Sequence, residues 1–272
     1  MELDSSMNSF NSLLIGAVKN KKSHLCIGLD ITPEGISNKY ASIDDLKLHT
    51  KKIISATEDL AVAFKPNLGF YERWGSEGFK WLEETMSLFA EETLVIGDAK
   101  RGDIGNTAKQ YAYSLFQHFG FDAVTLSPYM GFDSIEPFLS NPKKGVFILC
   151  KTSNPSASDF QNISHNDKKL FELVAKKCFE WNQNENIGLV VGATVPEEIV
   201  EVRKNAPGLP LLIPGVGAQG GSLEKSMEYG NKDGISLINV SRSIIFSSDL
   251  SEKSIRSSAK DYVDKMREII DE

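Results

Sequence analysis

The sequence has few cysteines, few histidines and no long apolar stretch, and each shortage excludes a class of protein. The three cysteines are odd in number and lack C-x-x-C spacing, so they do not indicate a disulfide framework. The four histidines are scattered, without the H-x-H or H-E-x-x-H pairs that favour a metal site. No run approaches the roughly 18 apolar residues of a membrane span. We therefore expect neither a metal centre nor a membrane segment.

Positive charge is also in short supply. Lysine and arginine number 30 against 37 acidic residues, which gives a net charge of −7. This balance excludes a general nucleic-acid binder, which needs a basic face to release counterions, but it allows a small phosphorylated ligand. The N-terminal segment has an acid early and only a short apolar run over residues 13–18, too little for a signal peptide. A cytoplasmic protein is expected.

Short apolar runs recur along the chain, and each stops at a polar residue, a proline or a glycine. Nearly continuous apolar runs are typical of strands that are covered on both faces, as in parallel sheets. Segments of helical period lie between them, for example over residues 104–119 and 255–270. The runs span residues 25–29, 61–64, 94–97, 123–126, 146–150, 188–191, 211–213 and 235–240.

Strand followed by helix, eight times over, predicts a (β/α)₈ barrel, with a doubly wound open sheet as the alternative. No linker or shift in composition divides the chain, so residues 1–272 are interpreted as one domain with an extra N-terminal helix. Residues 154–168, rich in Ser, Asn and Asp, follow the fifth run without strong periodicity. They are either a mobile lid or an ordinary surface excursion.

The residues at or just beyond the ends of the runs are the first candidates for function, because a barrel carries its active site at the carboxyl ends of its strands. Two carboxylates, a lysine and an arginine on one rim indicate more than ordinary polar strand ends. The candidates are Asp30, Lys65, Asp98, Ser127, Ser153, Thr194, Gln219 and Arg242.

The densest group of these residues is the sequence Asp98-Ala-Lys100-Arg-Gly-Asp103. Side chains two apart on a strand share a face, so Asp98 and Lys100 are expected to enter the barrel mouth side by side. Asp103 follows in the loop before the next helix. Taken alone, the motif also fits a salt-bridged strand end with Asp103 as a helix N-cap.

With its position at the end of the third strand, this motif resembles the catalytic motif of the orotidine 5′-phosphate decarboxylase family. The resemblance covers roughly residues 23–246, and the sequences KRGDIGNTA and SNPSA are similar to the subfamily with the longer chain. It implies cofactor-free decarboxylation of orotidine 5′-phosphate to uridine 5′-phosphate (UMP), the last step of de novo UMP synthesis. Lys100 would protonate the ring carbanion within a network of Asp98, Asp103 and Lys65.

The remaining matches imply contacts with the substrate. Asp30 matches a ribose-binding acid, and Ser153 matches a serine that contacts the pyrimidine. Gln219 and Arg242 match residues on the phosphate side. Thr107 matches a threonine that reaches into the neighbouring subunit's site together with the last acid of the motif, so a homodimer with shared active sites is implied.

The glycines of the segment PGVGAQGG fit two interpretations. Gly215-x-Gly217-x-x-Gly220 matches the dinucleotide-binding fingerprint, which should follow an early strand and precede an acid about 20 residues on. Here it follows the seventh run, and the corresponding distance brings Ser241 and Arg242. Glycines let backbone N–H groups approach an anion, so this segment is interpreted as a phosphate loop.

Two other functions stay open. One is a metal-dependent sugar-phosphate decarboxylase or aldolase of the same barrel superfamily, where a similar motif works with a divalent metal. The other is a non-catalytic sensor of a phosphorylated ligand. Ser153 and Gln219 favour the pyrimidine nucleotide, and a sensor gains nothing from placing Asp98 against an anionic ligand.

Overall fold

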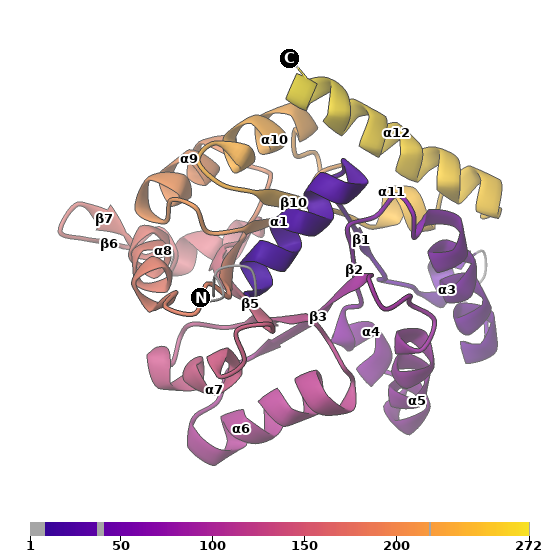
Figure 1. Ribbon diagram of the computed structural model, residues 1–272, viewed down its shortest axis with the longest axis horizontal. Helices are drawn as coiled ribbons and strands as arrows, with labels where there is room; N and C mark the ends of the chain where they lie inside the picture. Colours follow the sequence, from indigo (N-terminus) through magenta and orange to yellow (C-terminus); the bar gives the residue numbers. More distant parts are fainter. Residues whose placement is uncertain (1–8, 37–40, 218, 272) are drawn as a thin grey trace, which may run out of the picture.

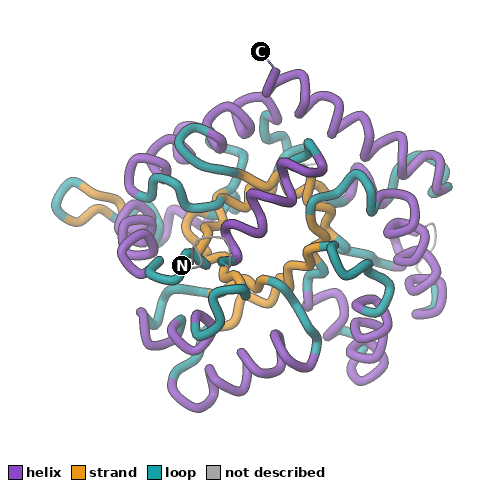
Figure 2. The backbone as a smooth tube through the Cα atoms, in the orientation of Figure 1, coloured by secondary structure: helices purple, strands orange, loops and turns teal. Residues whose placement is uncertain are grey.

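The computed structural model describes residues 9–36, 41–217 and 219–271. Within them, eight parallel strands close into a barrel that is ringed by helices (Figures 1 and 2). Around the barrel the order is β1-β10-β9-β8-β5-β4-β3-β2. The strands are β1 (Leu25–Gly28), β2 (Ala63–Lys65), β3 (Leu94–Arg101), β4 (Ala123–Leu126), β5 (Gly145–Lys151), β8 (Ile187–Val191), β9 (Leu211–Pro214) and β10 (Ser236–Val240).

Each of the eight apolar runs therefore forms one barrel strand, and the open-sheet alternative is wrong. Helices lie between and after the strands, and the longer ones cover the outside of the barrel (Figure 1). The helices are α2 (Pro33–Ile36), α3 (Ile43–Thr57), α4 (Leu68–Glu72), α5 (Gly75–Met86), α6 (Gly105–Tyr113), α7 (Glu136–Leu139), α8 (Leu170–Trp181), α9 (Pro196–Asn205), α10 (Leu223–Asn231), α11 (Arg242–Ile245) and α12 (Glu252–Asp271).

The two helical patterns predicted from periodicity are helical, with local differences. Residues 104–119 form α6 and then a π-helical turn, Ser114–His118. In α12, Ile255, Ala259, Val263 and Met266 are fully buried, as expected. Ile270 is 53% exposed, so the apolar stripe ends one turn earlier than its sequence pattern predicted.

The extra N-terminal helix expected from the sequence is α1 (Phe10–Lys21), and it lies across the amino-terminal end of the barrel (Figure 2). Phe10 packs against Gly145, where a Cβ would lie only 2.2 Å from the ring, and meets Phe147 edge-on with centroids 6.0 Å apart. Asn11 Nδ2 donates a hydrogen bond to the Ile187 carbonyl at 3.2 Å. The helix therefore closes the bottom of the barrel.

The barrel interior is apolar below and polar above. Cys26, Ile96, Phe147 and Leu212 pack with Phe10 in one buried cluster, separate from the larger core between strands and helices. The polar side chains that point inward lie nearer the carboxyl ends of the strands. This layering gives the polar site a dry, closely packed floor.

Residues 154–168 are more ordered than their sequence indicated. They contain a 3₁₀ turn (Pro155–Asp159), then β6 (Ser164–His165), which pairs with β7 (Lys168–Lys169) in an antiparallel hairpin. The hairpin projects away from the barrel (Figure 1). Asn166 and Asp167, with φ of 49° and 60°, form its two-residue turn. The strands are too short for an alternating pattern, so the Asn-Asp pair was the only signal for this hairpin.

Candidate active site

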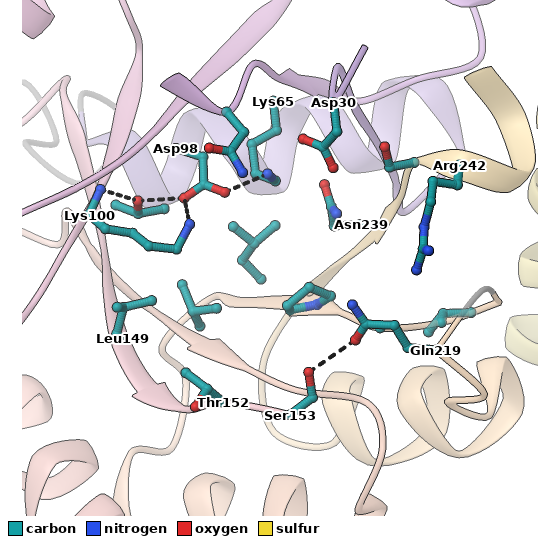
Figure 3. A pocket seen from close by; sticks show the side chains of 18 of the residues that line it. Asp30, Lys65, Asp98, Lys100, Leu149, Thr152, Ser153, Gln219, Asn239 and Arg242 are labelled. Carbon is teal, nitrogen blue, oxygen red and sulfur yellow. Dashed lines mark hydrogen bonds and ion pairs between the residues drawn. The ribbon is translucent and has the colours of Figure 1, made fainter. Parts of the chain in front are cut away.

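A cavity of about 260 Å³ opens at the carboxyl ends of the barrel strands. Figure 3 shows side chains from several strands pointing into it. The cavity is therefore where the sequence placed the site. Of the predicted site residues, it is lined by Asp30, Lys65, Asp98, Lys100, Ser153, Gly215, Gln219 and Arg242. Those outside its lining are Asp103, Thr107, Ser127, Thr194, Gly217 and Gly220.

Asp98 is the centre of a charged network at the inner end of the cavity (Figure 3). Its Oδ2 accepts a hydrogen bond from Lys65 Nζ at 2.7 Å, and its Oδ1 accepts one from Lys100 Nζ at 2.6 Å. Thr125 Oγ1 also donates to Oδ1, at 2.8 Å. The carboxylate is therefore fixed by three donors from three strands, β2, β3 and β4.

These contacts keep the network ionised. Burial acts to raise the pKa of Asp98, but the Lys65 and Lys100 ammonium groups outweigh it and hold that pKa well below its usual range. Burial acts to lower the pKa of Lys65, and Asp98 and Asp30 outweigh it in the same way, so that pKa is raised. The side chain of Lys65 is 6% exposed, whereas that of Lys100 is 47% exposed. Lys100 is therefore the member of the network that a ligand can reach.

The backbone around Lys100 departs from the expected strand alternation. The β3–β4 register shifts between Gly97 and Arg101, and Lys100 adopts a positive φ of 47°. Such a conformation at a residue other than glycine costs on the order of 1–3 kcal/mol and is concentrated at functional sites. Lys100 N donates to Thr125 Oγ1 at 2.9 Å, which helps to hold the irregular turn. Asp98 and Lys100 are in contact, as expected, but the irregular backbone at Lys100 brings them together, and not the alternation of a regular strand.

Thr125 and Asn239 are cavity residues that the sequence analysis did not select. Asn239 lies on the same side of the cavity as Asp30 and Arg242 (Figure 3), and its Oδ1 is 3.6 Å from Cys26 Sγ. Burial raises the pKa of the Cys26 thiol to about 12, so the thiol keeps its proton and can donate to Asn239. Both cavity residues stand inside apolar runs and not at their ends. Their signal was a polar side chain at an inward-facing position of a strand.

Asp30 offers an acceptor on the wall of the cavity. Its Oδ1 is buried and has no hydrogen-bond partner within the described residues. A buried carboxylate oxygen without a donor is costly, and a ligand hydroxyl would satisfy it. Asp30 also lies close enough to Lys65 to raise the pKa of that lysine.

The opposite end of the cavity is suited to an anion. Arg242 begins α11 and its side chain is exposed, pointing into the cavity without an ion pair among the described residues (Figure 3). Gly215 and Gly217 have φ of 103° and 80°, and a Cβ at Gly217 would lie 2.6 Å from Tyr262 Oη. Glycine is therefore required at this close approach.

The two loops beside this end are joined by a hydrogen bond. Ser153 Oγ, after β5, donates to Gln219 Oε1, after β9, at 3.0 Å (Figure 3). This contact connects the residues that the sequence analysis placed near a pyrimidine and near a phosphate.

Asp103 and Thr107 lie on the surface of their own chain. Asp103 Oδ1 accepts a hydrogen bond from the neighbouring Ile104 N at 2.8 Å and contacts neither lysine of the network. The N-cap of α6 is Ile104, so the interpretation of Asp103 as a helix N-cap is wrong. The expected place of Asp103 in the Lys100 network is not found within one chain.

Neither a metal-binding cluster nor a membrane-spanning helix occurs within the residues described. They form no group of three His, Cys, Asp or Glu side chains that could hold a metal ion. Nor is any described helix long and apolar enough to cross a membrane.

The comparison with protein families agrees with this geometry. The model of the orotidine 5′-phosphate decarboxylase / HUMPS family matches residues 23–256, a span that contains the whole barrel. The chain belongs to this family. Orotidine 5′-phosphate decarboxylase of Natronomonas pharaonis is 46% identical over 244 residues, which are 89% of this chain and 90% of the relative.

Solved structures of the family have the same fold. Leishmania donovani OMP decarboxylase superposes with a TM-score of 0.86 at 39% identity, covering 96% of this chain and 98% of that one. Leishmania donovani UMP synthase gives a TM-score of 0.88 at 41% identity, covering 96% of this chain. This chain corresponds to 56% of that synthase.

Proposed function

We propose that this chain decarboxylates orotidine 5′-phosphate to UMP, the last step of UMP synthesis. The observation that carries the proposal is the Lys65–Asp98–Lys100 network at the inner end of a cavity whose other end presents Arg242. The network supplies the charge that the reaction needs, and the arginine supplies a partner for the phosphate. Relatives named for this reaction match nearly the whole chain, which supports the same conclusion.

Lys100 is the proposed proton donor. Loss of carbon dioxide leaves an electron pair on a ring carbon, and without a cofactor to delocalise it, electrostatics must stabilise the charge. The ammonium of Lys100 is half exposed to the cavity, so it can turn from Asp98 towards that carbon and then protonate it. Lys65, almost fully buried, keeps Asp98 paired during this movement.

Asp98 is the proposed source of stress on the bound substrate. Two unit charges about 4 Å apart interact by roughly 4 kcal/mol at an effective dielectric near 20. The depressed pKa keeps Asp98 ionised, so a substrate carboxylate beside it is repelled until carbon dioxide leaves. Stress in the ground state and stabilisation of the carbanion then act in the same direction.

The remaining cavity residues bind the parts of the substrate that do not react. Asp30, with its unpartnered Oδ1, accepts a hydrogen bond from a ribose hydroxyl. Ser153 contacts the pyrimidine, while Gln219 and Arg242 hold the phosphate with the backbone of the glycine loop. Binding energy from this remote end contributes to rate when it is used to fix the reacting geometry.

Neither alternative function gains support. The relatives from Natronomonas pharaonis and Leishmania donovani carry the decarboxylase name, which does not favour a metal-dependent aldolase. A ligand sensor does not need Asp98 placed against an anionic ligand. The cytoplasmic location stays a prediction.

We further propose a homodimer in which Asp103 and Thr107 complete the partner's site. Both residues lie outside the cavity of their own chain, and Asp103 contacts no member of the charged network there. Ile104, Tyr129 and Met130 beside them are 54%, 88% and 51% exposed. The loop after β3, which carries Asp103, and the loop after β4, which carries Tyr129 and Met130, are neighbours, because Ser127 N donates to the Arg101 carbonyl. Apolar side chains that are exposed in one chain, next to Asp103, are what a dimer interface would bury.

One assay tests the proposed reaction. Orotidine 5′-phosphate is added to the purified protein after metal removal, and the absorbance of the orotate chromophore is followed. We expect the chromophore to disappear at a rate proportional to protein concentration, with UMP as the product by chromatography. A stable chromophore at micromolar protein, with properly folded protein shown by circular dichroism, would overturn the proposal.

A further inference from the structure

A single side chain, Gln161, ties the segment after β5 back to the rim of the cavity. Its Oε1 accepts a hydrogen bond from the backbone N–H of Thr152 at 2.9 Å, and its Nε2 donates to Thr152 Oγ1 at 2.8 Å. The oxygen and the nitrogen of the Gln161 carboxamide thus both form hydrogen bonds with Thr152. Thr152 Oγ1 in turn donates to Asn154 Oδ1 at 2.6 Å.

Gln161 is itself firmly held. Its N–H donates to the Ala157 carbonyl at 2.8 Å, and its carbonyl accepts from Phe171 N at 3.2 Å. Phe171 lies in the first turn of α8 with its ring 1% exposed in the core. The backbone of Gln161 is therefore anchored to the body of the barrel, and its side chain transmits that anchorage to Thr152.

Thr152 and Ser153 line the cavity, whereas Gln161 does not. The two hydrogen bonds from Gln161 fix the Lys151–Thr152 peptide plane and the Thr152 hydroxyl. Ser153 is the next residue, so the direction in which its hydroxyl enters the cavity depends on that plane. Its 3.0 Å hydrogen bond to Gln219 is the contact that this direction permits.

We propose that Gln161 is a positioning residue for recognition of the substrate's pyrimidine, acting through Thr152 on Ser153. The proposal rests on the proposed function, since it takes the base to lie against Ser153. Gln161 does not touch the substrate. It holds the turn that does, and its two hydrogen bonds to Thr152 couple residues 154–168 to the site as a fixed clamp and not as a moving lid.

The test compares two ligands that share ribose and phosphate and differ in the base. UMP and ribose 5-phosphate are titrated by calorimetry or by competition against turnover, using the wild type and Gln161→Leu, which keeps the volume but removes both hydrogen bonds. We expect UMP to bind about ten-fold more weakly, equivalent to about 1.4 kcal/mol. Ribose 5-phosphate should be affected by less than about two-fold, because Asp30, Arg242 and the glycine loop are untouched.

A conservative variant and a matched control sharpen this result. Gln161→Glu keeps the acceptor for Thr152 N–H, so its loss of UMP affinity should lie between wild type and Gln161→Leu. It also provides the readout should the leucine variant fold poorly. Gln183 is an exposed glutamine whose Nε2 donates to the Glu180 carbonyl away from the cavity. Gln183→Leu should leave both ligands unchanged.

Two outcomes contradict the inference. Equal losses for UMP and ribose 5-phosphate would make Gln161 a general structural support of the barrel rim. Unchanged binding of both ligands in the two Gln161 variants would mean that Thr152 and Ser153 are positioned without it. A wild-type protein that does not consume orotidine 5′-phosphate would instead contradict the proposed function, so the two failures are distinguishable.

Discussion

Lys65 and Lys100 hold opposite oxygens of one carboxylate, at 2.7 and 2.6 Å, yet only Lys100 is open to the cavity. The side chain of Lys65 is 6% exposed and that of Lys100 is 47% exposed. We therefore propose different roles for the two lysines: Lys65 keeps Asp98 charged, and Lys100 can leave it to reach a ligand. This asymmetry is the basis of the first two predictions.

Replacement of the exposed lysine should abolish chemistry while sparing binding. We expect Lys100→Ala to lower turnover by about 10²–10⁴-fold, the range for loss of a general acid. UMP binding should persist, because the ribose and phosphate contacts come from other strands. Chromophore loss and a UMP titration measure the two effects. Activity above a few per cent of wild type would show that Lys100 is not the proton donor.

Neutralising the central carboxylate should separate turnover from affinity. Asp98→Asn removes the charge that is expected to repel the substrate carboxylate, so turnover should fall while the substrate binds no more weakly than to the wild type. Single-turnover measurements over a range of protein concentrations give both values. A loss of substrate affinity as large as the loss of turnover would argue against ground-state repulsion. Thermal unfolding provides a check, because Lys65 loses its charged partner in this variant.

The exposed arginine should matter only for phosphorylated ligands. Arg242→Ala is expected to weaken UMP binding by about 2 kcal/mol, roughly 30-fold, which is typical of a lost charge-assisted hydrogen bond. Uridine, which lacks the phosphate, should bind as before. Arg73→Ala, an exposed arginine outside the cavity, is the control. Equal losses for UMP and uridine would place Arg242 outside the phosphate site.

Chelators should leave activity intact. The lysines of the network already supply positive charge at the reacting carbon, which is the role a metal ion would otherwise fill. The assay compares turnover before and after dialysis against EDTA, followed by addition of magnesium or manganese. Activity that disappears on chelation and returns with either metal would move the assignment to the metal-dependent alternative.

Mixing two inactive variants should restore activity if the site is shared. Lys100→Ala and Asp103→Ala homodimers should each be nearly inactive. In a mixed dimer, however, one site carries both defects and the other carries none. Equal amounts with free exchange give one half mixed dimers, so about a quarter of all sites should recover.

The control for this experiment is exchange itself. Native mass spectrometry establishes the fraction of mixed dimers, and turnover is measured on the same sample. If mixed dimers form and the mixture stays inactive, all catalytic groups belong to one chain and the shared-site proposal is wrong. A monomer by mass spectrometry would contradict it directly.

The sequence predicted the barrel and the residues at the strand ends, because periodicity and strand termini are local properties. Asp30, Lys65 and Asp98 were found in this way. Thr125 and Asn239 were missed, because they are polar positions within apolar runs and only closure of the barrel brings them to the cavity.

Features that depend on contacts between distant segments could not be predicted from the sequence. The positive φ of Lys100 follows from a shift in the β3–β4 register, which no pattern in β3 alone reveals. The clamp from Gln161 to Thr152 is equally invisible, because a glutamine in a polar segment has no periodicity to mark it.

The helix across the bottom of the barrel also determines how molecules travel. Phe10 and the apolar cluster packed with it fill the lower end of the barrel, and the cavity lies at the opposite end, among the carboxyl ends of the strands. The substrate enters through this end of the barrel, and both products, carbon dioxide and UMP, leave through it. Carbon dioxide is released at the inner end, is uncharged and has no partner that retains it, whereas the nucleotide is held at its phosphate. We expect carbon dioxide to dissociate first, while UMP is still bound. Release of UMP would then determine how soon the site is free for the next substrate.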